Sequence, residues 1–196
     1  MDERLERWLD ALLATPGLTS IRDRSEAARV HVDESLAALE VVRRYGGPIV
    51  DVGSGGGAPG IPLAAALPDR QVTLLEANGR KCAFLREMAL EFPNVTVVQG
   101  RAEEQQTDRF GVAVAKALAP PPVAAEWCLP LVAPGGAAIL YVGPTAQAEQ
   151  VARVAELLAA ELEPDSPPGL LVLRKLGPTP PGFPRRPGVA RKRPLA

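Results

Sequence analysis

The sequence predicts an α/β fold built on a doubly wound, mostly parallel sheet. Short apolar runs rich in valine and leucine alternate with longer segments that have helical apolar spacing. A glycine-rich stretch connects the first of these runs to the segment that follows it. This alternation is typical of a parallel sheet with helices on both faces, and ligands bind such sheets at the carboxyl ends of the strands.

The elements can be assigned in chain order. Helical spacing covers residues 3–14 and 25–44, and Pro16-Gly17 breaks the pattern between them. Strands are expected at residues 48–52, 71–75, 95–98, 112–115, 137–142 and 170–174. Helices are expected at residues 59–67, 80–91, 122–132 and 145–162. The chain after residue 174 is rich in proline, glycine and arginine and has no periodicity.

The expected organisation is an N-terminal helical cap over residues 1–46, a ligand-binding α/β core over 47–174 and a basic tail over 175–196. The 196 residues fit one compact unit, with a monomer as the simplest state. No apolar run reaches the roughly 18 residues of a membrane-spanning helix, and the charged N-terminus lacks a signal peptide's apolar core. Cys82 and Cys128 lie in apolar patterns, so we expect a reduced, cytoplasmic protein without disulfides or a metal site.

The charge of the chain is unevenly distributed, although the net charge is only −1. From Arg174 to Ala196 there are seven basic residues and no acidic ones, whereas the remainder has 15 basic and 23 acidic residues. A basic tail of this kind is typical of proteins that bind nucleic acid. It is equally typical of a solvated, disordered tail, and charge alone leaves both interpretations open.

An acidic residue and spaced glycines mark the end of the first predicted strand. The segment reads Asp51-Val-Gly-Ser-Gly-Gly-Gly-Ala-Pro-Gly60, a G-x-G-x-G spacing that differs from the G-x-G-x-x-G of dinucleotide-binding loops. Glycine lets the backbone turn tightly and approach a ligand closely, although a glycine turn without a ligand is the alternative. The pattern resembles the first motif of class I methyltransferases, whose loop wraps the methionine part of S-adenosylmethionine. The predicted cofactor-binding residues are Asp51, Gly53, Ser54, Gly55, Gly57 and Pro59.

Acidic residues also follow the second and third predicted strands. Glu76 closes the second strand, where a carboxylate can accept hydrogen bonds from ribose hydroxyls. Gly100-Arg-Ala-Glu-Glu104 follows the third strand, at the turn that contacts adenine in class I methyltransferases. Ala102 and Glu103 are therefore further candidates for cofactor binding. Glu103 or Glu104 could instead cap a short helix.

Several segments together resemble one family, the bacterial 16S ribosomal RNA guanine-N7 methyltransferases, also called glucose-inhibited division protein B. They include the glycine loop with its Pro59-Gly-Ile-Pro62 extension, Leu18-Thr-Ser-Ile-Arg-Asp23 and Leu74-Leu-Glu-Ala-Asn-Gly-Arg-Lys81. The most specific part is the tail, Leu173-Arg-Lys-Leu-Gly-Pro-Thr-Pro-Pro-Gly-Phe-Pro-Arg-Arg-Pro-Gly188 and Lys192-Arg-Pro-Leu195. The resemblance implies a Rossmann-like methyltransferase that uses S-adenosylmethionine, releases S-adenosylhomocysteine and acts on 16S rRNA or the small ribosomal subunit.

The resemblance also implies a catalytic position. Guanine N7 carries a free lone pair, so methyl transfer to it needs positioning and electrostatics and no general base. Lys116 stands where the family usually has arginine, and we expect it to orient the RNA; an ordinary lysine at a strand end is the alternative. Other departures are Glu34 for aspartate, Ala58 for a large apolar residue, Val142 for lysine and Gly17 for asparagine. His31, the sole histidine, lies in a helical pattern and is expected to be structural.

The tail supplies the predicted RNA contacts. Its cations can bind phosphates, and Phe183 could stack on a base. Lys175 and Thr179 match the family's tail motif, which implies that they face the active-site cleft. The predicted RNA-binding residues are Lys175, Thr179, Phe183, Arg185, Arg186, Arg191 and Lys192. Three alternatives stay open: a methyltransferase for another RNA or a small molecule, an RNA-binding module without activity and, more distantly, a nicotinamide dehydrogenase.

Overall fold

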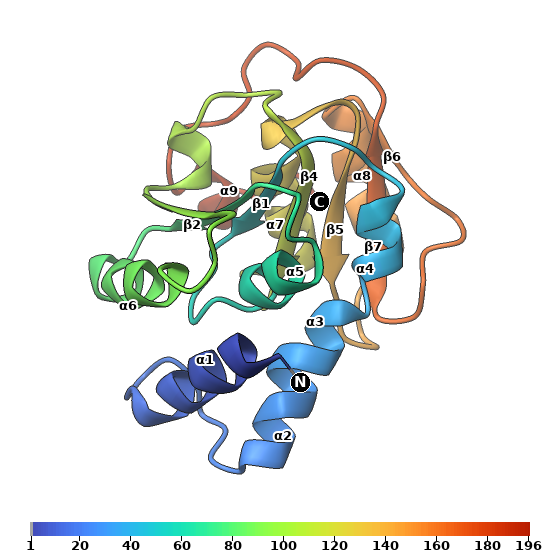
Figure 1. The fold of residues 1–196 in the computed structure, drawn as a ribbon. Helices are drawn as coiled ribbons and strands as arrows, with labels where there is room; N and C mark the ends of the chain where they lie inside the picture. Colours follow the sequence, from blue (N-terminus) through green and yellow to red (C-terminus); the bar gives the residue numbers. More distant parts are fainter. Residues whose placement is uncertain (1) are drawn as a thin grey trace.

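A computed structural model describes residues 2–196 and contains the mostly parallel sheet that the sequence predicts (Figure 1). Among these residues, seven strands form one sheet in the order β3-β2-β1-β4-β5-β7-β6. Strands β1 to β5 run parallel, whereas β7 is antiparallel to both β5 and β6. The strands are β1 Ile49–Val52, β2 Val72–Glu76, β3 Val95–Gln99, β4 Phe110–Lys116, β5 Val132–Tyr141, β6 Ala160–Leu162 and β7 Leu170–Lys175.

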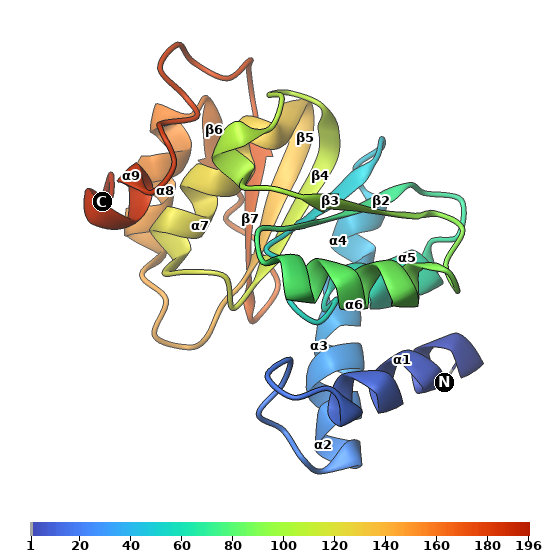
Figure 2. The same ribbon diagram turned by 90° about the vertical axis from the view of Figure 1, so that its left-hand side faces the viewer.

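Helices cover both faces of the sheet, and Figure 2 shows α7, α8 and α9 on one side and α5 and α6 on the other. Side chains of a strand alternate between the faces, so Ile49 joins the core beneath α5 and Val50 joins the core beneath α7. Within residues 2–196, no helix combines the length and apolarity needed to cross a membrane. These helices are α5 Gly60–Ala66, α6 Gly79–Ala89, α7 Pro121–Cys128, α8 Ala148–Leu157 and α9 Val189–Lys192.

The N-terminal segment forms helix α1 over Glu3–Ala14, as predicted, and then an interrupted helix. The predicted helix 25–44 consists of α2 Arg24–Ala28, a π-helical turn Arg29–Asp33, α3 Glu34–Leu36 and α4 Leu39–Arg43. The apolar spacing does not resolve the π turn, whose i→i+5 hydrogen bonds take one more residue than an α turn. Such turns occur frequently at functional sites.

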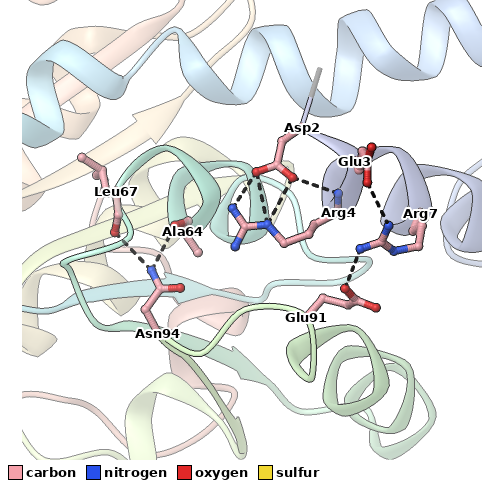
Figure 3. A network of polar contacts seen from close by, with 8 residues as sticks. All are labelled: Asp2, Glu3, Arg4, Arg7, Ala64, Leu67, Glu91 and Asn94. Carbon is pink, nitrogen blue, oxygen red and sulfur yellow. Dashed lines mark hydrogen bonds and ion pairs between the residues drawn. The ribbon is translucent and has the colours of Figure 1, made fainter.

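Helix α1 docks against the α/β core through its buried face and through polar contacts at its rim. Trp8, Leu9 and Leu12 are almost fully buried. The Asp2 side chain caps the helix by accepting from Arg4 N, and Arg7 pairs with Glu91 near the end of α6 at 2.8 Å (Figure 3). In the same view, Asn94 donates to the carbonyls of Ala64 and Leu67 and so ties the start of β3 to the end of α5.

Three elements differ from the predictions. The predicted helix 122–132 ends at Cys128 and continues as a 3-10 turn, Leu129–Leu131, before β5 begins at Val132. The predicted helix 145–162 ends at Leu157, because Ala160–Leu162 pairs with β7 as strand β6. The tail is ordered and forms the short helix α9. Both β6 and α9 exist through contacts with distant segments, which local periodicity does not encode.

Candidate active site

A cavity of about 350 Å³ opens where β1, β2 and β4 end. One wall comes from the strand ends and the residues after them, including Gly53, Glu76 and Leu118. The facing wall combines the 3-10 turn Ala102–Glu104, the Trp127 ring of α7 and two tail residues, Gly188 and Arg191. The location agrees with the general rule for parallel sheets, in which ligands bind at the carboxyl edge near the change in strand order.

Glu76 is the most precisely held side chain of this cavity. It is 9% exposed, and its two carboxylate oxygens accept from Gly55 N at 2.9 Å and from Asn78 N at 2.8 Å. Each oxygen retains a further lone pair, so the carboxylate can still accept hydrogen bonds from a ligand. The sequence predicts that Glu76 accepts hydrogen bonds from ribose hydroxyls, and these free lone pairs leave that role open to it.

The glycine loop has one face toward the cavity. Gly53 lies in the cavity lining and has φ of +73°, and Gly55 has φ of +57°. A Cβ atom on Gly53 would lie 2.3 Å from Leu118 Cδ1, so a larger residue would collide with the opposite loop. Gly53 and Gly55 thus allow the loop to bring a backbone N–H to Glu76 beside the cavity.

The other face of the loop packs against helix α1. The sequence predicts that Gly57 and Pro59 on this side of the loop bind the cofactor. Trp8 Nε1 donates to the carbonyl of Gly56 at 2.8 Å. A Cβ on Gly57 would lie 2.5 Å from Ile61 Cδ1 and 3.1 Å from Trp8 Nε1. Gly57 is buried and Pro59 is buried directly before α5, so both lie outside the cavity lining. Their place in the motif reflects packing of the loop against α1 and α5.

Asp51 and Ser54 also lie beneath the loop, each about 1% exposed. The sequence predicts that both bind the cofactor, but neither belongs to the cavity lining. Asp51 Oδ2 accepts from Gly60 N at 3.0 Å, and the Ser54 hydroxyl donates to the Asp51 carbonyl at 2.9 Å. Burial raises the pKa of Asp51 to about 7. Its Oδ1 atom has no hydrogen-bond partner among residues 2–196. The carboxyl group therefore holds the start of α5 against the strand end.

The turn after β3 contains both of the roles that the sequence leaves open. Ala102 is buried and lies in the cavity lining together with Glu103. Glu103 accepts from the backbone N–H of Gly188 in the tail at 3.2 Å. Glu104 caps the short turn by accepting from Arg101 N at 3.2 Å. The cap and the cavity contact therefore belong to neighbouring residues.

Lys116 lies at the end of β4, two residues before Leu118, and its side chain points toward the N-terminal helices. Its ammonium group donates to the Val30 carbonyl in the π turn and lies 3.2 Å from Glu34 Oε2. Its side chain is 15% exposed, and the nitrogen lies 6.0 Å from the centre of the Tyr141 ring. Lys116 and Glu34, which sequence analysis identifies as departures from the pattern of the similar family, therefore contact each other. Lysine is one atom shorter than arginine and glutamate one carbon longer than aspartate, so the reach of the pair is preserved.

His31 belongs to the same cluster. Its Nε2 atom lies 3.0 Å from the Thr19 hydroxyl. Burial and the nearby positive charge of Lys116 lower the pKa of His31, which favours the neutral ring. The sequence predicts a structural residue here, and the structure adds that this residue stands beside the predicted catalytic lysine.

Lys175 and Thr179 do not face the cavity, so that prediction is wrong. Lys175 is 1% exposed, and its ammonium group donates to the Leu129 carbonyl at 3.2 Å and to the Thr179 hydroxyl at 3.0 Å. Thr179 in turn donates to Asp108 at 2.8 Å. Because β7 is antiparallel, its last residue lies at the edge of the sheet opposite to Lys116.

Arg185 and Phe183 are also engaged within the protein. The Arg185 guanidinium binds both carboxylate oxygens of Glu126 on α7, at 2.6 and 2.5 Å, and Glu126 is 3% exposed. Phe183 is partly buried against the core beneath α7 and α8. Both residues therefore anchor the tail within the protein, and their predicted contact with RNA stays a prediction. Arg186, Arg191 and Lys192 are all exposed. The guanidinium carbon of Arg191 also lies 5.2 Å from the centre of the Trp127 ring.

The chain matches the model of one protein family, "GidB: rRNA small subunit methyltransferase G", over residues 2–172. A protein named "Ribosomal RNA small subunit methyltransferase G" from Synechococcus elongatus is 36% identical, over 91% of this chain and 82% of its own length. Its namesake from Chloroflexus aggregans is 34% identical over 98% of this chain and 89% of its own. This chain belongs to the rRNA small subunit methyltransferase G family.

Solved structures of other methyltransferases share the fold. The antibiotic-resistance methyltransferase Kmr has a TM-score of 0.55 at 17% identity, over 72% of this chain and 92% of its own. The structure of TYW2 from P. horikoshii in complex with MeSAdo has a TM-score of 0.57 at 14% identity, over 72% and 59%. The predicted family and the predicted fold class are thus confirmed for this member of the methyltransferase G family.

Sequence analysis missed several residues of the cavity in this methyltransferase, notably Leu118, Trp127, Gly188 and Arg191. Trp127 stands in an apolar run that is typical of a core helix, and its ring does join the core while one face reaches the cavity. The position of Leu118, two residues beyond the predicted catalytic lysine, is a signal that could have identified it. The tail residues carry no local signal, since only the path of the folded chain brings them to the cavity.

Proposed function

We propose that this protein transfers a methyl group from S-adenosylmethionine to guanine N7 of 16S rRNA and releases S-adenosylhomocysteine. The observation that carries the proposal is Glu76, a buried and doubly anchored carboxylate that faces a cavity at the carboxyl edge of the sheet. The family membership and the fold shared with methyltransferases support it. The small-subunit rRNA as substrate follows the names of the relatives, and guanine N7 follows the resemblance that sequence analysis describes.

The lining of the cavity fits an adenosine group. Val52, Leu75, Ala102 and Leu118 offer apolar surface for a flat base, and Gly53 leaves the space that a Cβ would fill. Glu76 would accept from the ribose hydroxyls. S-adenosylmethionine would supply an electrophilic methyl group on a sulfonium ion. The protein binds and orients the adenosine and excludes water from its base with the apolar wall.

Lys116 would orient the RNA substrate beside this cavity. Guanine N7 already has a lone pair, so the protein does not need to remove a proton before the methyl group is transferred. A lysine is a point charge that can attract a phosphate or a base edge. Glu34 and the Val30 carbonyl hold the ammonium group at the end of β4 and so limit its position.

The exposed tail cations Arg186 and Lys192 would contact RNA phosphates, together with the neighbouring Arg193. Phosphate contacts position RNA and weaken as salt concentration rises. We propose 16S rRNA or the small ribosomal subunit as the partner, a cytoplasmic location and a monomeric enzyme. Sedimentation analysis of the purified chain tests the last point.

Titration calorimetry with S-adenosylmethionine and S-adenosylhomocysteine tests the cofactor. We expect micromolar binding by the wild type and at least tenfold weaker binding by Glu76→Gln, because the amide nitrogen would face a backbone N–H. Glu87→Gln, a change on the exposed face of α6, is the matched control and should bind as the wild type does.

Methylation of small-subunit RNA with labelled cofactor tests the substrate, and borohydride–aniline cleavage identifies N7-methylguanine. Label in RNA with cleavage at a single guanine is the expected result. Cofactor binding with label on another atom or on no RNA would contradict the guanine-N7 assignment. Absence of cofactor binding would contradict the enzyme proposal and favour an RNA-binding module.

A further inference from the structure

The C-terminal tail returns to the cavity after leaving the sheet at its opposite edge. Strand β7 ends at Lys175 near the amino ends of β4 and β5, and the chain then crosses to α7 (Figure 2). Gly188 and Arg191 reach the cavity lining there. The cavity at the carboxyl edge is therefore closed on one side by the last part of the chain.

Contacts over residues 185–193 fasten this segment to the cavity wall. The buried Glu126 carboxylate binds Arg185 through two hydrogen bonds, and Glu103 accepts from Gly188 N at 3.2 Å. Ala190 is 1% exposed and belongs to the core beneath α7. Glu103 itself lines the cavity, so the tail is attached to residues that would contact a ligand.

Arg191 has the geometry of a ligand-binding residue. Its guanidinium carbon lies 5.2 Å from the centre of the Trp127 ring, and both residues line the cavity. The contact with the indole keeps the guanidinium at the cavity wall, where its N–H groups can donate to ring nitrogens or to a carboxylate. The residue is otherwise exposed, so its place in the wall depends on α9 and Trp127.

We infer that Arg191 is a cofactor-binding residue and that residues 185–193 form one wall of the cofactor site. The inference rests on the proposed function in that the cavity binds S-adenosylmethionine. Because the wall is made by the tail, cofactor binding and docking of the tail stabilise each other to the same extent. Arg191 therefore acts on the cofactor, whereas sequence analysis assigns it to RNA.

Calorimetry with S-adenosylhomocysteine on the full-length protein tests the inference. Arg191→Ala should bind about tenfold more weakly than the wild type, and Arg191→Lys should recover only part of the loss because an ammonium group does not stack as a plane. Lys192→Ala, at the next exposed position and outside the lining, should bind within twofold of the wild type.

Limited trypsin digestion supplies a readout of tail docking that does not depend on activity. In the wild type, S-adenosylhomocysteine should slow cleavage after Lys192 at least threefold, as followed by mass spectrometry. In Arg191→Ala this protection should be lost.

Wild-type affinity of Arg191→Ala for S-adenosylhomocysteine would overturn the inference and leave the proposed function intact. Loss of RNA binding by that variant with unchanged cofactor affinity would also overturn it and assign Arg191 to RNA. Failure of the wild type itself to bind S-adenosylhomocysteine would overturn both proposals.

Discussion

Asp51 and Glu76 stand at the ends of neighbouring strands, and their surroundings give them different properties. Glu76 faces the cavity and accepts two backbone hydrogen bonds. Asp51 is enclosed beneath the glycine loop, with one oxygen bound to Gly60 N and the other without a partner among residues 2–196. Burial favours the protonated form of Asp51, whose pKa rises to about 7. Of these two carboxylates, Glu76 is the one placed to touch a ligand.

The raised pKa predicts how Asp51 affects stability. An unfolded chain releases this proton near pH 3.8, the ordinary pKa of an aspartate, whereas the folded protein keeps it up to about pH 7. The stabilisation is therefore fully present below the lower pH and is lost as pH rises through the higher one. Asp51→Asn removes the titration, so its free energy of unfolding should increase relative to wild type between pH 4 and 8. Urea unfolding of both proteins measures this, and a pH-independent difference would contradict the prediction.

Lys116→Ala should lower the rate of methyl transfer at least tenfold and leave S-adenosylhomocysteine affinity within twofold. The reason is that Lys116 stands beside the cavity without lining it. Single-turnover methylation and calorimetry measure the two quantities. A rate loss below twofold would make Lys116 an ordinary residue at a strand end.

The pair of Lys116 with Glu34 offers a matched control for that variant. Lys116→Arg combined with Glu34→Asp preserves the combined reach of the two side chains, whereas each single change alters it. The double variant should retain activity within threefold, and Lys116→Arg alone should lose more.

At the scale of elements, the glycine loop serves two partners at once. Its first half borders the cavity, and its second half accepts helix α1 through Gly56 and Gly57. The glycine loop thus both borders the cavity and forms the docking site of helix α1. The π turn between α2 and α3 continues the N-terminal helix, and its Val30 carbonyl also accepts a hydrogen bond from Lys116.

Gly57→Ala should destabilise the protein by about 1–3 kcal/mol. Its φ of +104° is unfavourable for alanine, and the added Cβ would meet Ile61 and Trp8. Thermal unfolding followed by circular dichroism measures the loss. Gly143→Ala, where nothing lies within 4 Å of the added Cβ, should change stability by no more than about 0.5 kcal/mol. Equal effects of both changes would exclude the packing explanation.

At the scale of the whole molecule, the tail connects the two edges of the sheet. Lys175 and Thr179 fix it to Asp108 at one edge, and Arg185 fixes it to Glu126 on α7. We propose that the N-terminal helices, the α/β core and this tail act as one compact unit. Three of the tail's six cations contact other parts of the protein, namely Lys175, Arg185 and Arg191. The other three, Arg186, Lys192 and Arg193, are exposed.

Arg185→Ala should destabilise the protein by about 3 kcal/mol, because it leaves the buried Glu126 carboxylate unpaired. Urea unfolding measures the change. Arg186→Ala, the exposed neighbour, should stay within about 0.5 kcal/mol of wild type. Replacing both partners, Arg185→Met with Glu126→Leu, should recover most of the stability. A loss that persists in the double variant would show that the ion pair is not the cause.

The sequence by itself determined the parallel core, the family and Glu76 as a cavity residue. These features are local, because a strand, the residue that ends it and the turn that follows are all encoded within about ten positions, as strand lengths and loop lengths in α/β folds imply. Parallel strands bring such ends to one edge, so local patterns sufficed to place them together.

Only the tertiary structure decided which glycines face the cavity, which edge holds Lys175 and what the tail cations bind. An antiparallel last strand reverses the edge at which its end lies, and the sequence carries no signal of that direction. The apolar pattern of helix α7 does not predict that Glu126 and Trp127 contact the tail. In the structure, Glu126 binds Arg185 and the Trp127 ring lies beneath Arg191. Long-range contacts set these positions, since their energies arise between residues far apart in the chain.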